Sequence, residues 1–219
     1  MEIRYIDIKK TVLSDNTDLA DQIRENILQS NIFMLNLMAS PGAGKTSLLL
    51  ETIRRMKNDF RIGVIEGDIE SVVDSEKVAA LGISTVQLRT GGECHLDAPM
   101  INEALQNMAL DALDLIFIEN IGNLVCPAEF DTGAMRRAMI LSVPEGDDKV
   151  LKYPLMFSVC DALVINKIDT ISLFDFDMEK LHMQAQKLNP HIQIFKTSCR
   201  TGEGIDEWCR WLRGEIAES

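Results

Sequence analysis

The chain has 219 residues, 46% of them hydrophobic and 26% charged, which is typical of a soluble single domain that buries its core without disulfides. Its 34 acidic and 22 basic residues give a formal charge of −12, which argues against broad binding to nucleic acid or to an anionic membrane. No apolar run approaches the roughly 18 residues of a membrane span. Five cysteines, an odd number, and a start without a signal-peptide pattern predict a cytoplasmic protein with reduced thiols.

An amphipathic helix is predicted over residues 15–30, outside the sheet. Ser14 and Asp15 precede it as candidate caps. Its apolar residues recur at helical spacing: Leu19, Ile23, Ile27 and Leu28. We therefore divide the chain into an N-terminal segment that contains this helix, residues 1–30, and one main domain over residues 31–219.

Apolar strands and amphipathic helices alternate along the rest of the chain. The predicted strands are Ile32–Met38, Arg61–Glu66, Thr85–Leu88, Leu113–Glu119, Arg137–Val143, Ala162–Ile165 and Ile192–Phe195. The predicted helices lie near residues 45–57, 74–81, 98–108, 149–158, 176–188 and 203–216. Asp97 and Pro99 mark the start of the third of these helices. The alternation predicts an α/β fold with a doubly wound, mostly parallel sheet, which binds ligands at the carboxyl ends of its strands.

The first strand leads into a glycine-rich loop and a helix, in the order Ala39-Ser40-Pro41-Gly42-Ala43-Gly44-Lys45-Thr46-Ser47. Such a loop directs successive backbone N–H groups at one point, where the helix dipole also favours an anion. We expect Lys45 to reach the β- and γ-phosphates of a nucleotide and Thr46 to place its hydroxyl on Mg²⁺. Ala39 stands where the usual motif has its first glycine, so a glycine-rich turn without a ligand is the alternative.

A later strand ends in a motif that suits a guanine base: Asn166-Lys167-Ile168-Asp169. Asp169 can accept hydrogen bonds from N1–H and from the exocyclic amine, which adenine does not offer in that arrangement. Asn166 can bond the other edge of the base, and the stem of Lys167 can lie along the ring. The next strand ends in a loop that resembles the one whose backbone amide reads O6 of guanine in GTPases, with an ordinary glycine turn as the alternative. Its residues are Ser198, Cys199 and Arg200.

Acidic residues at strand ends are candidate ligands of Mg²⁺ or of its water shell. Asp68 follows one predicted strand and Glu119 closes another. Usual GTPases have D-x-x-G where this chain has Glu119-Asn120-Ile121-Gly122. Because glutamate is longer than aspartate, it stays open whether Glu119 contacts the ion or only its water. Asp74 is a candidate either for orienting the attacking water or for capping a helix. Together with Lys45, these three carboxylates form the predicted catalytic set.

Cys94, His95 and Cys126 form a predicted site for a softer metal. Cys94 and His95 are adjacent in a loop between a strand and a helix, and Cys126 lies seven residues after Glu119. Thiolate and imidazole donors suit Zn²⁺ or Ni²⁺ rather than Mg²⁺. The alternative for an isolated cysteine is a small buried hydrophobe, which fits the remaining cysteines.

The motifs together resemble those of the HypB family, the nickel-incorporation GTPases of [NiFe]-hydrogenase maturation. They occupy residues 39–46, 66–69, 93–98, 119–127 and 166–169, within a resemblance that covers about residues 10 to 215. It implies a P-loop GTPase of the SIMIBI class that binds GTP and Mg²⁺, forms a homodimer, and carries Ni²⁺ to the hydrogenase large subunit with a HypA-type partner. Cys94, His95 and Cys126 match the family's metal ligands, which lie at the dimer interface. The chain has neither the C-x-x-C-G-C motif nor the His-rich tract of some members, so we expect no second high-affinity nickel site and no nickel storage.

Three other functions stay open from the sequence. A urease accessory protein of the UreG type is the nearest, although the Cys-His/Cys arrangement favours HypB over it. A small-molecule kinase would share the phosphate loop but has no need of a guanine clamp. A nucleotide-gated scaffold without catalysis would use the thiols structurally, and GTP turnover with metal binding would separate it from a GTPase.

Overall fold

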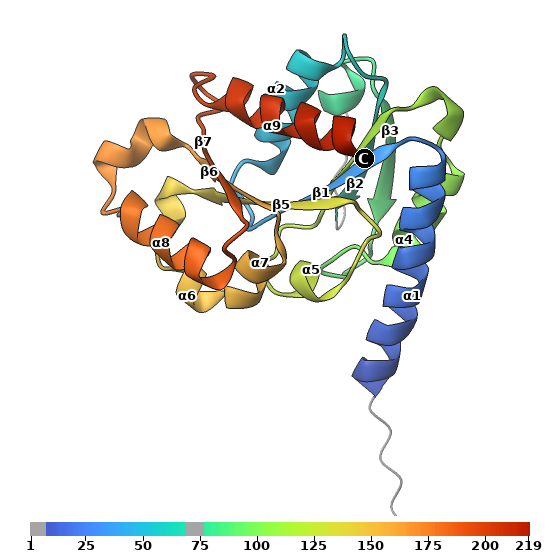
Figure 1. Cartoon of the computed structure of the whole chain (residues 1–219), viewed down its shortest axis with the longest axis horizontal. Helices are drawn as coiled ribbons and strands as arrows, with labels where there is room; N and C mark the ends of the chain where they lie inside the picture. Colours follow the sequence, from blue (N-terminus) through green and yellow to red (C-terminus); the bar gives the residue numbers. More distant parts are fainter. Residues whose placement is uncertain (1–7, 69–76) are drawn as a thin grey trace, which may run out of the picture.

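A parallel sheet forms the centre of the molecule (Figure 1). The computed structural model describes residues 8–68 and 77–219, and within them seven strands have the order β3-β2-β4-β1-β5-β6-β7. Every neighbouring pair of strands is parallel. The strands are β1 Phe33–Ala39, β2 Ile62–Asp68, β3 Ser84–Arg89, β4 Leu115–Glu119, β5 Arg136–Ser142, β6 Ala162–Asn166 and β7 Gln193–Lys196. The predicted fold class and the seven predicted strands are confirmed.

Helices connect the strands in the predicted alternation. They are α1 Ile8–Gln29, α2 Lys45–Met56, α4 Ala98–Gln106, α5 Cys126–Glu129, α6 Lys149–Lys152, α7 Pro154–Val159, α8 Met178–Leu188 and α9 Ile205–Glu218. Short 3-10 turns are η1 Leu110–Ala112, η2 Val143–Glu145 and η3 Ile168–Leu173. The predicted start of α4 is confirmed, because the side chain of Asp97 accepts a hydrogen bond from the N–H of Met100 at 2.9 Å.

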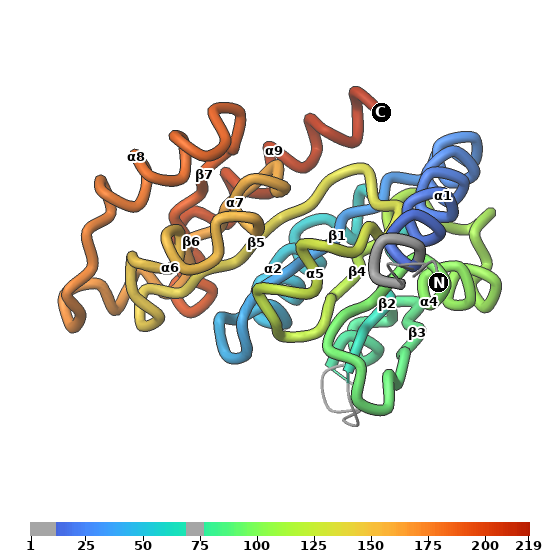
Figure 2. The backbone as a smooth tube through the Cα atoms, turned by 90° about the horizontal axis from the view of Figure 1, so that it is seen from below, coloured from blue at the N-terminus to red at the C-terminus, as the bar shows by residue number. Residues whose placement is uncertain are grey.

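Both faces of the sheet are covered, as a doubly wound fold requires. Helices α2 and α9 pack on one face, against alternate residues of β1 such as Leu35 and Leu37. The opposite face carries α1 and α4 at one end, where Met34 of β1 packs. At the other end it carries α6, α7 and α8, where Met38 packs. Figures 1 and 2 both show α1 beside α4. The central strands are therefore buried, and the loops at their carboxyl ends remain accessible.

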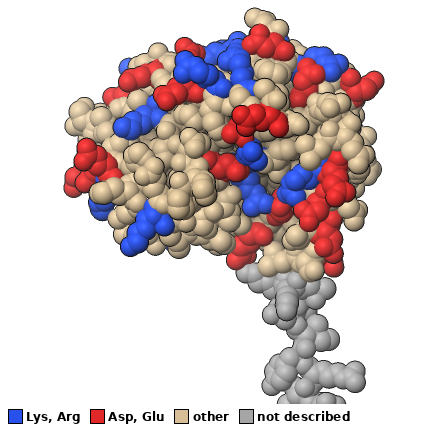
Figure 3. Space-filling view, viewed as in Figure 1, with Lys and Arg blue, Asp and Glu red and all other residues tan. Residues whose placement is uncertain are grey.

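The surface is mixed in charge on the face drawn in Figure 3, where acidic and basic side chains are interspersed. Oppositely charged side chains of the molecule form ion pairs, such as Arg61 with Asp114 at 2.7 Å. Among the described residues, no helix has both the length and the apolar character needed to cross a membrane.

Helix α1 is longer than predicted, and its buried face includes the predicted Ile23 and Ile27 but not Leu28. It begins at Ile8, so Ser14 and Asp15 lie inside the helix and the prediction that they cap it is wrong. Its buried stripe consists of Asn16, Ala20, Ile23 and Ile27. Leu28 is 42% exposed, because the residue after Ile27 lies about 100° further around the helix.

The segment 149–158 forms two short helices instead of the predicted one. Tyr153 separates α6 from α7 with φ −131° and ψ 53°, and Pro154 follows it. A proline keeps the preceding residue out of the helical region by steric clash, which explains the break. Of the predicted helix 74–81, residues 77–79 are helical, and residues 74–76 lie outside the described residues.

Candidate nucleotide and metal sites

The phosphate loop joins β1 to α2 and holds two glycines at positive φ. Gly42 has φ 77°, and Gly44, which precedes the first helical residue Lys45, has φ 105°. A Cβ atom on Gly44 would lie 2.4 Å from Nδ2 of Asn166, so the loop and the predicted guanine segment are in direct contact. Glycine suits this position because it tolerates both the backbone conformation and the close approach. The loop thus leads directly into the N-terminus of α2, the arrangement in which helix N–H groups can bind an anion.

A pocket of about 510 Å³ opens beside the start of α2. Its lining comes from the phosphate loop, from the carboxyl ends of β2 and β4 and from two lysines: Pro41, Gly42, Gly44, Lys45, Thr46, Ser47, Glu66, Gly67, Asp68, Lys77, Glu119, Asn120, Ile121, Gly122 and Lys167. The fold thus brings the predicted residues Lys45, Asp68 and Glu119 into one pocket. Ala43, in the middle of the loop, is buried. Asp74 lies outside the described residues, and its role stays a prediction.

Oxygen donors meet on one side of this pocket. The hydroxyl of Thr46 donates to Oε1 of Glu119 at 2.7 Å. Glu66 stands opposite Glu119 in the β2–β4 register and is only 2% exposed. Hydroxyl and carboxylate oxygens are the donors that Mg²⁺ prefers, so the chemistry of this set fits the predicted ion. Glu66 is missing from the predicted site residues, and its signal is a carboxylate inside the apolar strand Ile62–Asp68.

A second pocket, of about 360 Å³, lies on the other side of the phosphate loop. Its lining includes the predicted guanine residues and part of the last loop: Gly44, Ser47, Asn166, Lys167, Asp169, Thr170, Cys199 and Arg200. Asn166 is 1% exposed; its amide donates to the carbonyl of Ala43 at 3.1 Å and accepts from the N–H of Cys199 at 3.3 Å. Lys167 has φ 62° and donates its ammonium to the carbonyl of Gly42 at 2.7 Å.

Asp169 is held at the edge of this second pocket. The hydroxyl of Ser198 donates to Oδ1 of Asp169 at 2.6 Å. Arg200 pairs with Oδ2 at 3.7 Å, although the arginine side chain is 85% exposed. Asp169 follows β6, whereas Ser198 and Arg200 follow β7, so the two segments predicted to surround the base meet here.

Cys94, His95 and Cys126 form one cluster, and their candidate ligand atoms all lie within 4.8 Å of one another. The two thiol sulfurs are 3.0 Å apart, and the Cys94 sulfur lies 4.0 Å from Nδ1 of His95. The adjacent Cys94 thiol, together with burial, raises the pKa of Cys126. His95 is 9% exposed and stacks on Phe130 with ring centroids 3.9 Å apart. Two sulfurs and one imidazole nitrogen are a donor set that fits Ni²⁺ or Zn²⁺.

Asn120 connects this cluster to the nucleotide pocket. It is fully buried, and its Oδ1 accepts hydrogen bonds from the N–H groups of Leu96 at 3.0 Å and Ile121 at 2.9 Å. Further along the same segment, the amide of Asn123 donates to the carbonyl of Cys94 at 3.2 Å. The segment after β4 is therefore bonded to the loop that carries Cys94. Asn120 is a second residue that the sequence analysis does not assign to the site.

Similarity to known proteins agrees with this geometry. The family model "CobW/HypB/UreG, nucleotide-binding domain" matches residues 33–196. The hydrogenase maturation factor HypB of Escherichia coli (strain K12) is 44% identical over 209 residues, which are 95% of this chain and 72% of that protein. This chain belongs to the HypB family. The resemblance predicted from the motifs is confirmed.

Two other HypB proteins show the same relationship. The hydrogenase/urease maturation factor HypB of Helicobacter hepaticus is 41% identical over 206 residues, which are 92% of this chain and 84% of that protein. A crystal structure of HypB from Helicobacter pylori in complex with nickel superposes with a TM-score of 0.88 at 39% identity. The superposition covers 93% of this chain and 96% of that one.

The other cysteines of this HypB-family chain are buried or half-buried. Cys160 and Cys209 are each 1% exposed, and Cys199 is half-buried. Burial raises the pKa of Cys199 and of Cys209 to about 11 and raises that of Cys160 as well. Neutral thiols in apolar surroundings behave as small hydrophobes. Within residues 8–68 and 77–219, Cys94, His95 and Cys126 are the only group of three or more His, Cys, Asp or Glu side chains placed to hold one metal ion.

Glu145 is a further polar contact of the phosphate loop that the HypB motifs do not include. Its carboxylate accepts a hydrogen bond from the hydroxyl of Ser40, the second residue of the loop. The same carboxylate accepts from the N–H and the hydroxyl of Ser142, both at 2.7 Å, and so closes a capping box after β5. One side chain thus fixes the loop to the end of β5.

Proposed function

We propose that this chain is a GTP-hydrolysing metallochaperone that binds Ni²⁺ and assists its insertion into [NiFe]-hydrogenase. The observation that carries the proposal is segment 119–126, which lines the phosphate pocket at Glu119 and supplies the soft-donor cluster with Cys126. A metal carrier under nucleotide control needs such a connection. The choice of hydrogenase maturation as the cellular process is based on the names of the relatives, which are hydrogenase maturation factors.

Guanine specificity is assigned to Asn166, Lys167 and Asp169, with the loop of Ser198, Cys199 and Arg200 beside them. A carboxylate offers about four lone-pair sites, so the bonds from Ser198 and Arg200 leave Asp169 able to accept from N1–H and the amine of guanine. Asn166 would bond the other edge of the base. The stem of Lys167 spans the second pocket toward Gly42 and offers a surface for the ring.

Phosphate binding and hydrolysis are assigned to the first pocket. Mg²⁺, when bound, would supply positive charge that offsets the negative charge developing in phosphoryl transfer. Thr46, Asp68 and Glu119 would hold the ion or its water shell through oxygen donors. Lys45 would stabilise the β- and γ-phosphates as a positioned positive charge. Orientation of the attacking water is predicted for Asp74.

The cargo is assigned to Cys94, His95 and Cys126, with Zn²⁺ as a competitor of Ni²⁺. One chain offers three donors here and Cys94 is exposed, so a four-coordinate ion needs water or a donor from a second copy. We therefore extend the proposal to a cytoplasmic homodimer with the metal at its interface. This dimer would receive Ni²⁺ from a HypA-type chaperone and deliver it to the hydrogenase large subunit.

The test is a Ni²⁺ titration of the protein loaded either with GDP or with a non-hydrolysable GTP analogue. We expect the two affinities to differ by a coupling free energy of roughly 1–3 kcal/mol, and Ni²⁺ to change the affinity for the analogue by the same factor. Native mass spectrometry of the same samples follows dimer formation. Identical Ni²⁺ affinity and an identical oligomeric state with both nucleotides contradict the proposal.

Urease maturation is a second candidate, because the Helicobacter hepaticus relative is named for both enzymes. Deletion of the gene, followed by measurement of hydrogenase and urease activity with and without added Ni²⁺, separates the two. A hydrogenase defect with intact urease supports the first candidate. Loss of urease alone transfers the proposal to the second.

A further inference from the structure

Asn16 is a polar residue in the otherwise apolar buried stripe of α1. It is 5% exposed, and Ala20, Ile23 and Ile27 continue its face of the helix. A buried amide costs free energy unless its groups are hydrogen-bonded. Both groups of the Asn16 amide are therefore expected to have hydrogen-bond partners.

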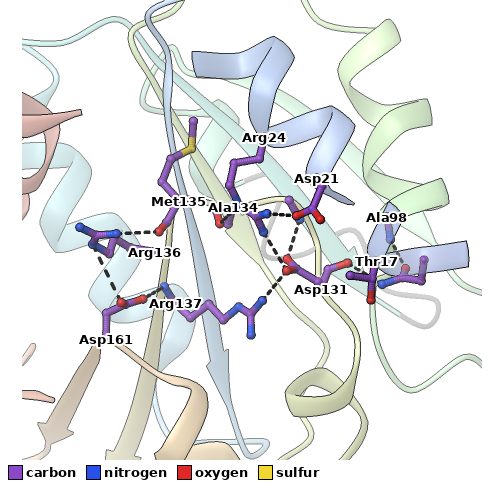
Figure 4. A network of polar contacts seen from close by, with 12 residues as sticks. Thr17, Asp21, Arg24, Ala98, Asp131, Ala134, Met135, Arg136, Arg137 and Asp161 are labelled. Carbon is purple, nitrogen blue, oxygen red and sulfur yellow. Dashed lines mark hydrogen bonds and ion pairs between the residues drawn. The ribbon is translucent and has the colours of Figure 1, made fainter. Parts of the chain in front are cut away.

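The side chain of Asn16 bridges two distant segments of backbone. Its Oδ1 accepts a hydrogen bond from the N–H of Ala98 at 2.8 Å, and its Nδ2 donates to the carbonyl of Asp131 at 2.9 Å. The N–H of Ala98 is one of the first amides of α4, which no carbonyl of that helix can satisfy. Figure 4 shows Ala98 and Asp131 beside α1.

Both bonded residues lie close to His95, one of the soft-metal donors. Ala98 follows His95 by three residues, and Asp131 follows Phe130, whose ring stacks on His95 at an interplanar angle of 28°. The contacts form a closed circuit from Asn16 to Ala98, along the chain to His95, across to Phe130, and back through Asp131. Loss of the Asn16 amide therefore removes the two hydrogen bonds that join the Ala98 and Asp131 segments through α1.

The remaining contacts of α1 keep the Asp131 side of the circuit in place. Arg24 pairs with the carboxylate of Asp131 at 2.7 Å and donates to the carbonyl of Ala134 at 3.3 Å (Figure 4). A Cβ atom on Gly133 would lie 2.8 Å from the carbonyl oxygen of Ala20, so the two backbones touch. Helix α1 thus supports the chain directly after α5, the helix that begins with a metal donor.

We propose that Asn16 is a positioning residue for the metal cargo. It holds the loop of Cys94 and His95 against the segment of Cys126 at the separation that one ion requires. The inference rests on the proposed metal-carrying function. Donors bind Ni²⁺ or Zn²⁺ only at about 2.0–2.3 Å, so a small shift between the two segments removes a donor. Loss of groups that orient metal ligands from behind typically lowers affinity by about 10–100-fold.

The test compares two variants of Asn16 with a control on the same helix. Asn16→Ala removes both bonds, whereas Asn16→Asp keeps an acceptor for Ala98 but cannot donate to Asp131. Ile27→Ala is the control, because Ile27 belongs to the same buried stripe and packs at the far end of it from Asn16. It lowers stability through a cavity without removing either bond.

Each full-length protein is titrated with Co²⁺ and Ni²⁺, and the Co²⁺ absorption bands report the thiolate donors and the geometry. We expect both Asn16 variants to bind either metal about tenfold or more weakly and to change the Co²⁺ bands. Ile27→Ala should lower the melting temperature yet bind metal like the parent, and GDP affinity should stay unchanged in all variants.

The outcomes separate this inference from the proposed function. Parent-like metal binding and Co²⁺ bands in both Asn16 variants overturn the positioning role alone. An equal loss of affinity in Ile27→Ala overturns it too, because general stability then explains the effect. A parent chain that binds neither metal overturns the proposed function and this inference with it.

Discussion

The contact between the phosphate loop and the guanine segment can be tested with Gly44→Ala. The new Cβ would lie 2.4 Å from Nδ2 of Asn166, so one of the two groups must move. Asn166 is 1% exposed, and its movement breaks the hydrogen bond to the carbonyl of Ala43. Gly42→Ala is the matched control, because Gly42 also has a positive φ, while no heavy atom of the described residues beyond its chain neighbours lies within 4 Å of its Cβ position.

The two substitutions should differ in cost. A non-glycine residue held in a sparsely populated backbone conformation costs about 1–3 kcal/mol, and this applies to both glycines. At Gly44, a broken hydrogen bond that leaves a buried amide unsatisfied adds about 1–3 kcal/mol. We therefore expect Gly44→Ala to lower the free energy of unfolding by about 2–6 kcal/mol, and Gly42→Ala by about 1–3 kcal/mol.

The assay is urea unfolding of the nucleotide-free protein. Because φ 105° at Gly44 is also further from the left-handed well near +57° than φ 77° at Gly42, the contact is isolated by a double-mutant cycle with Asn166→Ala. The Gly44 and Asn166 changes should couple by about 1–2 kcal/mol, whereas those at Gly42 and Asn166 should be additive. Additivity in both pairs would refute the reasoning.

Other predictions concern the base, the metal and the acid dependence of stability. Asp169→Asn should lose GTP and gain XTP binding, because an amide donates toward the carbonyl of xanthine; discrimination on the order of 10⁴-fold is attainable, and unchanged GTP affinity contradicts it. Cys94→Ser should weaken Ni²⁺ and Zn²⁺ together in a titration, while Cys209→Ser should not; equal losses would mean that the wrong thiols are named. Burial raises the pKa of Asp131, but Arg137, the N–H of Gly133 and a second arginine outweigh it and hold that pKa below its usual value. The resulting stability is complete above the unfolded pKa near 4 and is lost as the pH falls through the lower folded value. Asp131→Asn should flatten that part of the urea-unfolding profile, and an unchanged acid slope would argue against this role.

The sheet could be predicted from sequence because its central strands are buried on both faces. A nearly continuous apolar run such as Phe33–Ala39, in which only Asn36 is polar, needs no distant information to be recognised. The glycine-rich loop, the guanine motif and the Cys94–His95 pair are likewise local patterns. The break at Tyr153 also has a local cause in Pro154 and could have been predicted from it.

The missed residues share a different property, which is that their partners are far away in sequence. Glu145 reaches Ser40 across 105 residues, and Asn16 reaches Asp131 across 115 residues. Each of them reads locally as an ordinary polar residue of a turn or a helix. Only the folded chain shows that Asn16 occupies a core position of α1, where a polar side chain must find partners.

Cys126 lies between two anchored points of one segment. On the nucleotide side, the N–H of Asn120 bonds to β1 at 3.0 Å, and Gly122 is so close to the phosphate loop that its Cβ would lie 3.1 Å from Pro41. On the other side, α1 holds Asp131 through one hydrogen bond and one ion pair. A displacement of the phosphate loop by nucleotide is therefore expected to be absorbed between residues 121 and 130.

His95 lies outside the segment 121–130 that is expected to absorb this displacement. Its neighbour Leu96 is bonded to the side chain of Asn120 at 3.0 Å, and its ring rests on Phe130. We therefore expect nucleotide to change the separation of Cys126 from His95 more than that of Cys94 from His95, which are adjacent in the chain. Because linked binding free energies are reciprocal, bound Ni²⁺ must then favour the nucleotide state whose phosphate loop matches that separation.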